Sequence, residues 1–229
     1  KNPKKILIII QRSNGDVLLS QTLINKIFES YNSPQIDILV NDDTVLVAQL
    51  LSNISDIHKF SYSKKKNNRW KQEKKLVFKL IKKYDLAINL TASDRSVLYS
   101  LIAGKRSISA VERKNKKSWW KKILLSDYYF FDNKKHILRN NLEPLKILKI
   151  KYDLVQDLPN ISGEVIDRIN IKLTQMGITD FMIFHPSTQY SYKVYPQSLR
   201  HELLSLLSKL NIAVVVTGGN NEIDLAIKN

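Results

Sequence analysis

A buried strand followed at once by a turn and a helix opens the chain, and this order constrains the fold most strongly. Residues 6–10 form an unbroken run of isoleucine and leucine (ILIII), which is typical of a strand buried on both faces of a parallel sheet. The polar residues 12–16 (RSNGD) interrupt the run with turn chemistry. From Val17 to Phe28, apolar residues recur at helical spacing. In an open α/β sheet, such a junction lies at the carboxyl end of a strand, where ligands bind.

Short apolar runs and amphipathic stretches continue to alternate, which predicts a mainly parallel sheet of the α/β class. Helices are expected after most strands, and Gly104 and Gly177 are expected to end two of them. No dinucleotide-binding glycine motif or Walker loop is present, which argues against dinucleotide oxidoreductases and P-loop enzymes. The further strands are expected at residues 35–40, 54–60, 85–90, 106–111, 128–131, 181–184 and 212–216.

The net charge of +16 is unevenly distributed over the 229 residues. Of 37 Lys/Arg and 21 Asp/Glu residues, six and eight fall in residues 152–229, which leaves 31 and 13 in residues 1–151. The first part therefore has a net charge of +18 and the second part a net charge of −2. This asymmetry points to an anionic partner for the first part: a nucleic acid, an anionic membrane, or a phosphorylated or carboxylated substrate.

The positive excess stops near residues 150–163, where proline and glycine punctuate the sequence before the α/β pattern restarts. We therefore expect two domains, residues 1–155 and 156–229. The second shows only two convincing strands, whereas typical sheets have about four to six, so we expect it to be incomplete in this chain. No apolar run approaches the roughly 18 residues that span a bilayer. The absence of cysteine fits a cytosolic protein.

Polar loops follow strands in both parts of the chain. The first carries Ser13, Gly15 and Asp16; taken alone, Asp16 is more simply interpreted as a helix N-cap than as a catalytic acid. The second, residues 185–196 (HPSTQYSYKVYP), leads into a helix and offers two hydroxyls and a cation. Such groups suit a diphosphate. The residues concerned are Ser187, Thr188 and Lys193.

Two basic segments also follow strands in the first part. Residues 61–83 hold ten Lys/Arg against one acid, a pattern that fits a ligand-binding loop and a solvated helix face equally well. The second segment holds Arg113 and three lysines next to Trp119 and Trp120. We expect these tryptophans in the core, with a membrane interface as the alternative. The four histidines are scattered without metal-ligand spacing, so no metal site is expected.

The order and spacing of these motifs resemble those of the heptosyltransferase family of glycosyltransferases (family 9), over the whole chain. The resemblance rests on residues 13–16, on residues 184–196, and on a strand ending in Thr-Gly-Gly with an acid shortly after, residues 217–222. Thr22 stands where the family has proline, and Tyr195 where it has tryptophan. The family's last donor motif is absent, which agrees with an incomplete second domain.

The resemblance implies a GT-B fold, in which two Rossmann-like parallel-sheet domains face a cleft. It implies an inverting, metal-independent transfer of heptose from a nucleotide sugar, ADP-heptose, to the lipopolysaccharide inner core, with no cofactor. Asp16 would be the general base. The donor would bind to Ser187, Thr188, Lys193 and Glu222. The anionic acceptor would bind to Ser13, Lys64, Lys65, Lys66, Arg69 and Arg113.

The resemblance also implies a location, a cytoplasmic protein that binds peripherally to the inner face of the inner membrane, with no nucleic-acid partner. Two alternatives stay open from the sequence. The chain could use a different sugar donor or lack activity, or it could be a basic nucleic-acid-binding protein, which the acidic second part disfavours.

Overall fold

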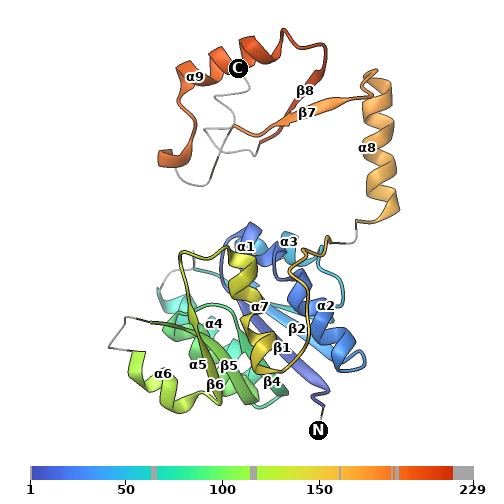
Figure 1. Ribbon diagram of the computed structural model, residues 1–229. Coiled ribbons are helices and arrows are strands. Elements are labelled where there is room, and N and C mark those ends of the chain that lie inside the picture. Colours follow the sequence, from blue (N-terminus) through green and yellow to red (C-terminus); the bar gives the residue numbers. More distant parts are fainter. Residues whose placement is uncertain are drawn as a thin grey trace. The chain divides into compact units, whose positions relative to one another are not determined.

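The computed structural model describes residues 2–62, 66–113, 118–159, 161–186, 188 and 191–218, and the chain divides into two compact units, residues 1–160 and 161–229. The first unit is a six-stranded sheet with helices on both faces (Figure 1). All neighbouring strands pair in parallel, in the order β3-β2-β1-β4-β5-β6. The strands are β1 (Lys5–Ile10), β2 (Gln35–Asn41), β3 (Asp56–Phe60), β4 (Tyr84–Asn89), β5 (Gly104–Glu112) and β6 (Asp127–Phe131).

One face of the sheet is covered by helices that follow β1, β2 and β6. Alternate side chains of β1, Ile6 and Ile8, pack there with Leu23 and Leu142 in the larger core cluster. These β1 residues are fully buried, as expected for a central parallel strand. The elements on this face are α1 (Asn14–Leu18), α2 (Gln21–Ser30), η1 (Asp42–Thr44), α3 (Val45–Ala48) and α7 (Ile137–Ile147).

The opposite face is covered by the α4–α5–α6 layer, which consists of α4 (Lys66–Leu80), α5 (Asp94–Ala103) and α6 (Trp119–Leu124). The other alternate residues of β1, Leu7 and Ile9, pack there with Leu80 of α4 and Tyr99 of α5. Residues of α5, β5 and the end of α6 form a third cluster beside it. Helices therefore cover both sides of a parallel sheet, and the predicted α/β class is confirmed for this unit.

The structure corrects one local prediction and confirms another with a different backbone geometry. The helix predicted from Val17 onward is two helices, because the hydroxyl and the backbone N–H of Ser20 both donate to the Val17 carbonyl, at 2.6 and 3.0 Å, and turn the chain after α1. Gly104 ends α5 as predicted, but its backbone is extended (φ −98°, ψ 144°) and not left-handed, because the same residue begins β5. A Cβ at Gly104 would lie 2.7 Å from the Cβ of Ala87 in β4, so the close strand pairing requires glycine there.

The segment that follows α7 is bonded to α2. The Thr22 hydroxyl accepts from the backbone N–H of Asp157 at 2.8 Å and donates to the Val155 carbonyl at 3.2 Å. Asn25 Nδ2 donates to the Asp157 carboxylate at 2.8 Å. A proline in place of Thr22 could form neither of the hydroxyl bonds.

In the second unit, two parallel strands and their helices are described. These elements are α8 (Gly163–Gln175), β7 (Phe181–Phe184), η3 (Ser191–Lys193), α9 (Gln197–Leu207) and β8 (Ala213–Val216). β7 and β8 pair over their full lengths. Gly177 has φ +66° just after α8, which is the helix-ending role that the sequence predicts. Among the helices of the described ranges, none has the length and apolar character that crossing a bilayer requires.

Candidate functional site

The candidate site lies at the carboxyl ends of β1 and β4, the two central strands of the first unit. The chain runs from β1 outward to β3 on one side, and then returns to β4 and continues to β6 on the other. In open α/β sheets, such a topological switch point leaves a crevice in which ligands bind. The predicted site residues Ser13 and Asp16 lie directly after β1 and therefore at this point.

The carboxylate of Asp16 is oriented by an ion pair with Arg12. Arg12 Nε donates to Asp16 Oδ2 at 2.8 Å, and the two side chains are 29% and 20% exposed. The Arg12 guanidinium also lies over the ring of Phe131, with 4.7 Å between Cζ and the ring centroid. Within the described ranges, no hydrogen bond engages Oδ1 of Asp16, so this oxygen can accept a proton or a hydrogen bond from a ligand.

The position of Asp16 in α1 differs from the simplest interpretation of the sequence. Ser13, with an extended backbone, is the N-cap residue, and Asp16 is the third residue of the helix. Asn141 of α7 donates from Nδ2 to the backbone carbonyl of Asp16 at 3.3 Å. We did not predict a role for Arg12 or Asn141. The i,i+4 spacing of Arg12 and Asp16 could have revealed the ion pair, whereas Asn141 is brought to Asp16 from 125 residues away.

Gly15 leaves open space beside Asp16. It is a helical residue, and a Cβ built on it would have no heavy atom within 4 Å. Neither packing nor a positive φ therefore requires glycine. In a helix, glycine is less favourable than alanine by about 1 kcal/mol, so helix stability does not explain it either. A role that glycine can have at such a position is to let a ligand approach the backbone closely.

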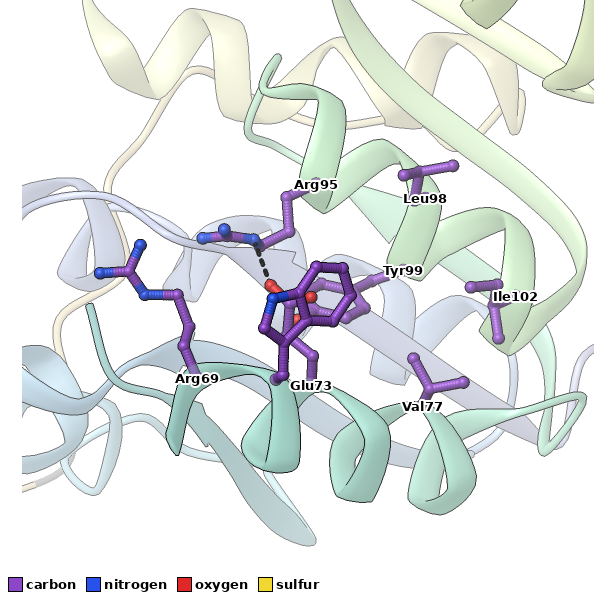
Figure 2. Close-up of a pocket in the computed structure, with 8 residues that line it drawn as sticks. Arg69, Glu73, Val77, Arg95, Leu98, Tyr99 and Ile102 are labelled. Carbon is purple, nitrogen blue, oxygen red and sulfur yellow. Dashed lines mark ion pairs between the residues drawn. The ribbon is translucent and has the colours of Figure 1, made fainter. Parts of the chain in front are cut away.

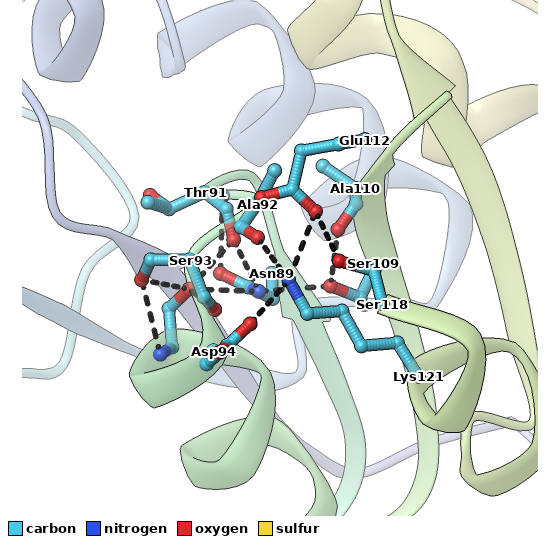
Figure 3. Close-up of polar contacts among 11 residues, drawn as sticks. Asn89, Thr91, Ala92, Ser93, Asp94, Ser109, Ala110, Glu112, Ser118 and Lys121 are labelled. Atoms are coloured by element: carbon cyan, nitrogen blue, oxygen red, sulfur yellow. Dashed lines mark hydrogen bonds and ion pairs between the residues drawn. The ribbon is translucent and has the colours of Figure 1, made fainter. Parts of the chain in front are cut away.

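A buried polar network shapes the loop that follows β4 (Figure 3). Asn89 Nδ2 donates to the Thr91 carbonyl at 2.6 Å and to the Ser109 hydroxyl of β5 at 2.8 Å. The Thr91 hydroxyl in turn accepts from the backbone N–H of Gln11, at the end of β1, at 2.9 Å. These bonds join the carboxyl ends of β1 and β4 to each other and to β5, and thereby fix the loop that follows β4 beside the candidate site.

Lys121 anchors the same region from α6, and the sequence did not single it out. Its side chain is fully buried, and Nζ lies 2.7 Å from Asp94, 2.9 Å from Glu112 and 2.7 Å from the Ala92 carbonyl. Burial alone would raise the pKa of Glu112, but the hydrogen bonds that Lys121 and Ser118 donate to its carboxylate hold that pKa below its ordinary value. Figure 3 shows Lys121 reaching across to the loop after β4.

Arg69, predicted to bind the acceptor, lies at a groove between α4 and α5 with a volume of about 410 Å³ (Figure 2). Its Nη2 donates to the Tyr62 carbonyl at 3.2 Å. Across the groove, Arg95 pairs with Glu73 at 3.0 Å and covers the Phe60 ring, 4.5 Å from the ring centroid. The groove is otherwise lined by apolar and aromatic side chains: Trp70, Val77, Leu98, Tyr99 and Ile102.

The other predicted acceptor residues fall on different parts of the first unit. Arg113 follows β5 and lies over the Phe130 ring of β6, with 5.4 Å between Cζ and the ring centroid. Lys66 begins α4, but its side chain is not among those that the structure describes. Lys64 and Lys65 lie outside the described residues altogether. The assignment of Arg69 and Arg113 to one acceptor stays a prediction.

In the second unit, the predicted donor loop lies at the carboxyl end of the β7–β8 sheet. His185 Nδ1 and the Thr217 hydroxyl are 3.0 Å apart and join the ends of the two strands. Thr188 is half-buried, and Lys193 is exposed in η3 with Nζ 5.7 Å from the Tyr192 ring centroid. Two further predicted donor residues, Ser187 and Glu222, lie outside the described residues. The donor-binding roles stay predictions.

A second polar cluster lies at the amino ends of β2, β3 and β4, away from the candidate site. Asp37, Asp56 and His58 place potential ligand atoms within 4.8 Å of one another, a juxtaposition that the sequence spacing did not suggest. The cluster is already bonded: Tyr84 donates to Asp37 at 2.8 Å, its hydroxyl lies 2.8 Å from His58 Nε2, and Lys79 pairs with Asp56 at 3.0 Å. Burial, aided by Lys79, lowers the pKa of His58. The side chains of this cluster therefore bond to other side chains of the protein, namely those of Tyr84 and Lys79.

Comparisons with known proteins agree with the resemblance stated from the sequence. No protein-family model matches the chain. The chain is 24% identical over 228 residues to lipopolysaccharide heptosyltransferase 3 of Escherichia coli, a match that covers 95% of this chain and 65% of that protein. This chain therefore spans about two thirds of the length of the curated relative.

Solved structures extend the likeness to the fold. A glycosyl transferase family 9 protein from Veillonella parvula matches with a TM-score of 0.78 and 17% identity, over 98% of this chain and 64% of that one. The E. coli heptosyltransferase WaaC, solved with ADP-2-deoxy-2-fluoro heptose, matches with a TM-score of 0.68 and 15% identity, over 96% of this chain and 70% of that one. The predicted GT-B fold class is thus confirmed, and the chain resembles the lipopolysaccharide heptosyltransferases of glycosyltransferase family 9 in both sequence and fold.

Proposed function

We propose that the chain is part of a glycosyltransferase that moves a heptose from ADP-heptose to the lipopolysaccharide inner core. The observation that carries the proposal is the position of Asp16, in a Ser-x-Gly-Asp motif at the switch point of the sheet, with one carboxylate oxygen held by Arg12. The likeness to a lipopolysaccharide heptosyltransferase supports the acceptor class. The ADP-heptose analogue held by WaaC supports the donor class.

In the proposed reaction, Asp16 acts as the general base. An acceptor hydroxyl loses its proton to Asp16 Oδ1 while its oxygen attacks the anomeric carbon of the donor. The bond from that carbon to the diphosphate oxygen breaks, and the electron pair leaves with ADP. Attack on the face opposite the leaving group inverts the anomeric centre. Arg12 keeps the carboxylate in one orientation by holding Oδ2, so Arg12 is a positioning residue.

The departing diphosphate would be stabilised in the second unit without a metal ion or a cofactor. Lys193 supplies a positive charge, and Ser187 and Thr188 supply hydroxyl donors to the oxygens on which negative charge develops. Glu222 would accept a hydrogen bond from the nucleoside, at the ribose. Charge stabilisation by fixed donors is often the largest contribution that an enzyme makes to such a step.

The acceptor would be held by the basic first unit. Its inner-core sugars carry carboxylates and phosphates, which match the excess of lysine and arginine in residues 1–151. The residues proposed for this contact are Ser13, Lys64, Lys65, Lys66, Arg69 and Arg113. Because this acceptor is anchored in a membrane, we expect the protein to act as a peripheral protein at the inner membrane surface.

The proposal is tested by incubating the full-length protein that contains this chain with ADP-heptose and a deacylated inner-core oligosaccharide, with and without EDTA, and measuring the mass of the product by mass spectrometry. We expect the mass to increase by one heptose residue in both conditions, and not with the Asp16→Asn variant. Transfer from a different nucleotide sugar at a higher rate would overturn the donor assignment alone. A folded full-length protein that transfers no sugar to this acceptor would refute the proposed function.

A further inference from the structure

The outer surface of the α4–α5–α6 layer carries large apolar side chains that no part of the described chain covers. Trp70 and Phe78 on α4 are 69% and 67% exposed, and Trp119 and Ile123 on α6 are 63% and 70% exposed. Trp119 thus lies outside the core in which we expected it, whereas Trp120 packs against the cluster formed by α5, β5 and the end of α6. On the opposite face, helices α2 and α7 expose no large apolar side chain, and α3 exposes Leu46.

The outward apolar residues of α4 form a stripe of their own. Trp70 and Phe78 are eight residues apart, about two helical turns, and therefore lie on one side of the helix, with Lys74 between them. Leu76 and Leu80 are buried on the other side against the sheet. Packing against the sheet explains why Leu76 and Leu80 are apolar, but it does not explain why Trp70 and Phe78 are. An exposed apolar patch of this kind marks a surface that is covered by a partner.

Positive charge surrounds these apolar residues. The exposed side of α4 and the turn after it hold Lys71, Lys74, Lys75, Lys79, Lys82 and Lys83. Glu73 is the single acid on α4, and Arg95 neutralises it at 3.0 Å. Near α6, Lys122 and Arg113 both lie over the Phe130 ring, 5.2 and 5.4 Å from its centroid. The partner that this surface fits is therefore both anionic and able to accept apolar side chains.

We propose that the outer surface of the α4–α5–α6 layer docks on an anionic lipid bilayer. Lysines there would contact lipid headgroups, while the tryptophan, phenylalanine and isoleucine side chains enter the boundary between headgroups and acyl chains. A nucleic acid would satisfy the lysines but would leave aliphatic side chains such as Ile123 exposed. The bilayer satisfies both kinds of residue.

The placement of this surface connects it with the candidate site. In a parallel sheet, a helix that follows a strand begins at the carboxyl edge, so Trp70 near the start of α4 and Trp119 at the start of α6 lie toward the edge that holds Asp16. A bilayer on this surface would border the site. The inference deepens the proposed function, since it names the surface that brings the site to a membrane-borne acceptor, but lipid binding can be measured with no donor or acceptor present.

The test is cosedimentation of the full chain with vesicles of phosphatidylcholine alone or of equal parts of phosphatidylcholine and phosphatidylglycerol. The basic variant is Lys71→Gln/Lys74→Gln/Lys75→Gln, and the apolar variant is Trp70→Ser/Phe78→Ser. Matched controls on the opposite face are Leu46→Ser, which removes a side chain that is 77% exposed, and Lys149→Gln/Lys151→Gln in the segment just after α7. Circular dichroism confirms that each variant is folded.

We expect the parent chain to bind the anionic vesicles and not the neutral ones. Near an anionic surface, each lysine is worth roughly five-fold in affinity, so the basic variant should bind about 100-fold more weakly, and the apolar variant at least about 10-fold more weakly. The controls should bind like the parent. Absence of binding to anionic vesicles, or an equal loss in the controls, would overturn the proposal. Binding to duplex DNA but not to vesicles, with the same dependence on the lysines, would assign the surface to nucleic acid instead.

Discussion

Replacing Asp16 with asparagine separates a catalytic role for this residue from a structural one. Asparagine has nearly the same shape, but it cannot take a proton from the acceptor hydroxyl. If Asp16 is the general base, kcat should fall by about 10²–10⁴-fold, which corresponds to roughly 3–5 kcal/mol in the activation free energy.

The cost to the fold is small by comparison and can be worked from the structure. The substitution removes the Arg12–Asp16 ion pair, an i,i+4 contact of 2.8 Å between side chains that are 29% and 20% exposed. Exposed pairs of this spacing contribute about 0.3–0.5 kcal/mol, and partial burial brings the value to about 1 kcal/mol. For a unit of this size, that loss should lower the thermal midpoint by about 2–4 °C.

Arg12→Met is the matched control, because it removes the same ion pair and leaves the carboxylate in place. It should lower the thermal midpoint by as much as Asp16→Asn does. Its effect on kcat should be roughly five-fold, since only the orientation of the carboxylate is lost, at about 1 kcal/mol. The assay is single-turnover heptose transfer at saturating donor, with thermal unfolding of each variant. Equal kcat values for the two variants, or near-parental kcat for Asp16→Asn with chemistry rate-limiting, would show that Asp16 only supports the structure.

Three further predictions follow from the described contacts. Lys121→Met should lower the free energy of unfolding by about 1.5–3 kcal/mol, because the charge-assisted bonds to Asp94 and Glu112 are lost. The depressed pKa of Glu112 means that its pairing stabilises the fold above its ordinary pKa of 4.5 and that this contribution is lost as the pH falls through the lowered pKa. The deficit of Lys121→Met, measured by urea unfolding, should therefore shrink on acidification; a deficit independent of pH would argue against the ion pairs. Gly15→Ala should raise the stability of the first unit by about 0.5–1 kcal/mol, because its Cβ meets open space, yet slow heptose transfer if a ligand approaches the backbone there; unchanged transfer would exclude that approach. Lys193→Ala should weaken ADP binding, measured by calorimetry on the full chain, by about 1.5–3 kcal/mol, with Lys172→Ala on α8 as the control, and equal affinities of parent and variant would remove Lys193 from the donor site.

The opening strand shows what the amino-acid sequence determined by itself. Residues 6–10 are all fully buried, and their sequence contains no polar residue because a central parallel strand is covered on both faces. The same local logic predicts a break after β1 and a helix close behind it, although the helix begins at Asn14, inside the predicted turn of residues 12–16. The ligand edge of the sheet could therefore be located from sequence, and the Arg12–Asp16 pair was within reach of the same reasoning through its helical spacing.

Lys121 shows what local sequence could not determine. Its neighbours in the segment WWKKIL give no sign that one lysine is fully buried and the next is exposed. Its burial depends on Glu112 and Asp94, which are contributed by the end of β5 and the start of α5. A buried charge is tolerated only where such partners are provided, and partners from other elements exist only once the chain has folded.

Tertiary structure also determined which side of α4 faces solvent. Both sides of this helix carry apolar residues, so its spacing alone does not tell which side faces the sheet. The order β3-β2-β1-β4-β5-β6 places α4 in the crossover from β3 to β4, on the face opposite α2 and α7. That crossover buries Leu76 and Leu80 against β1 and its neighbours and turns Trp70 and Phe78 to the outside. The pairing of strands far apart in the chain, which no local pattern encodes, therefore decided which apolar residues became core and which became surface.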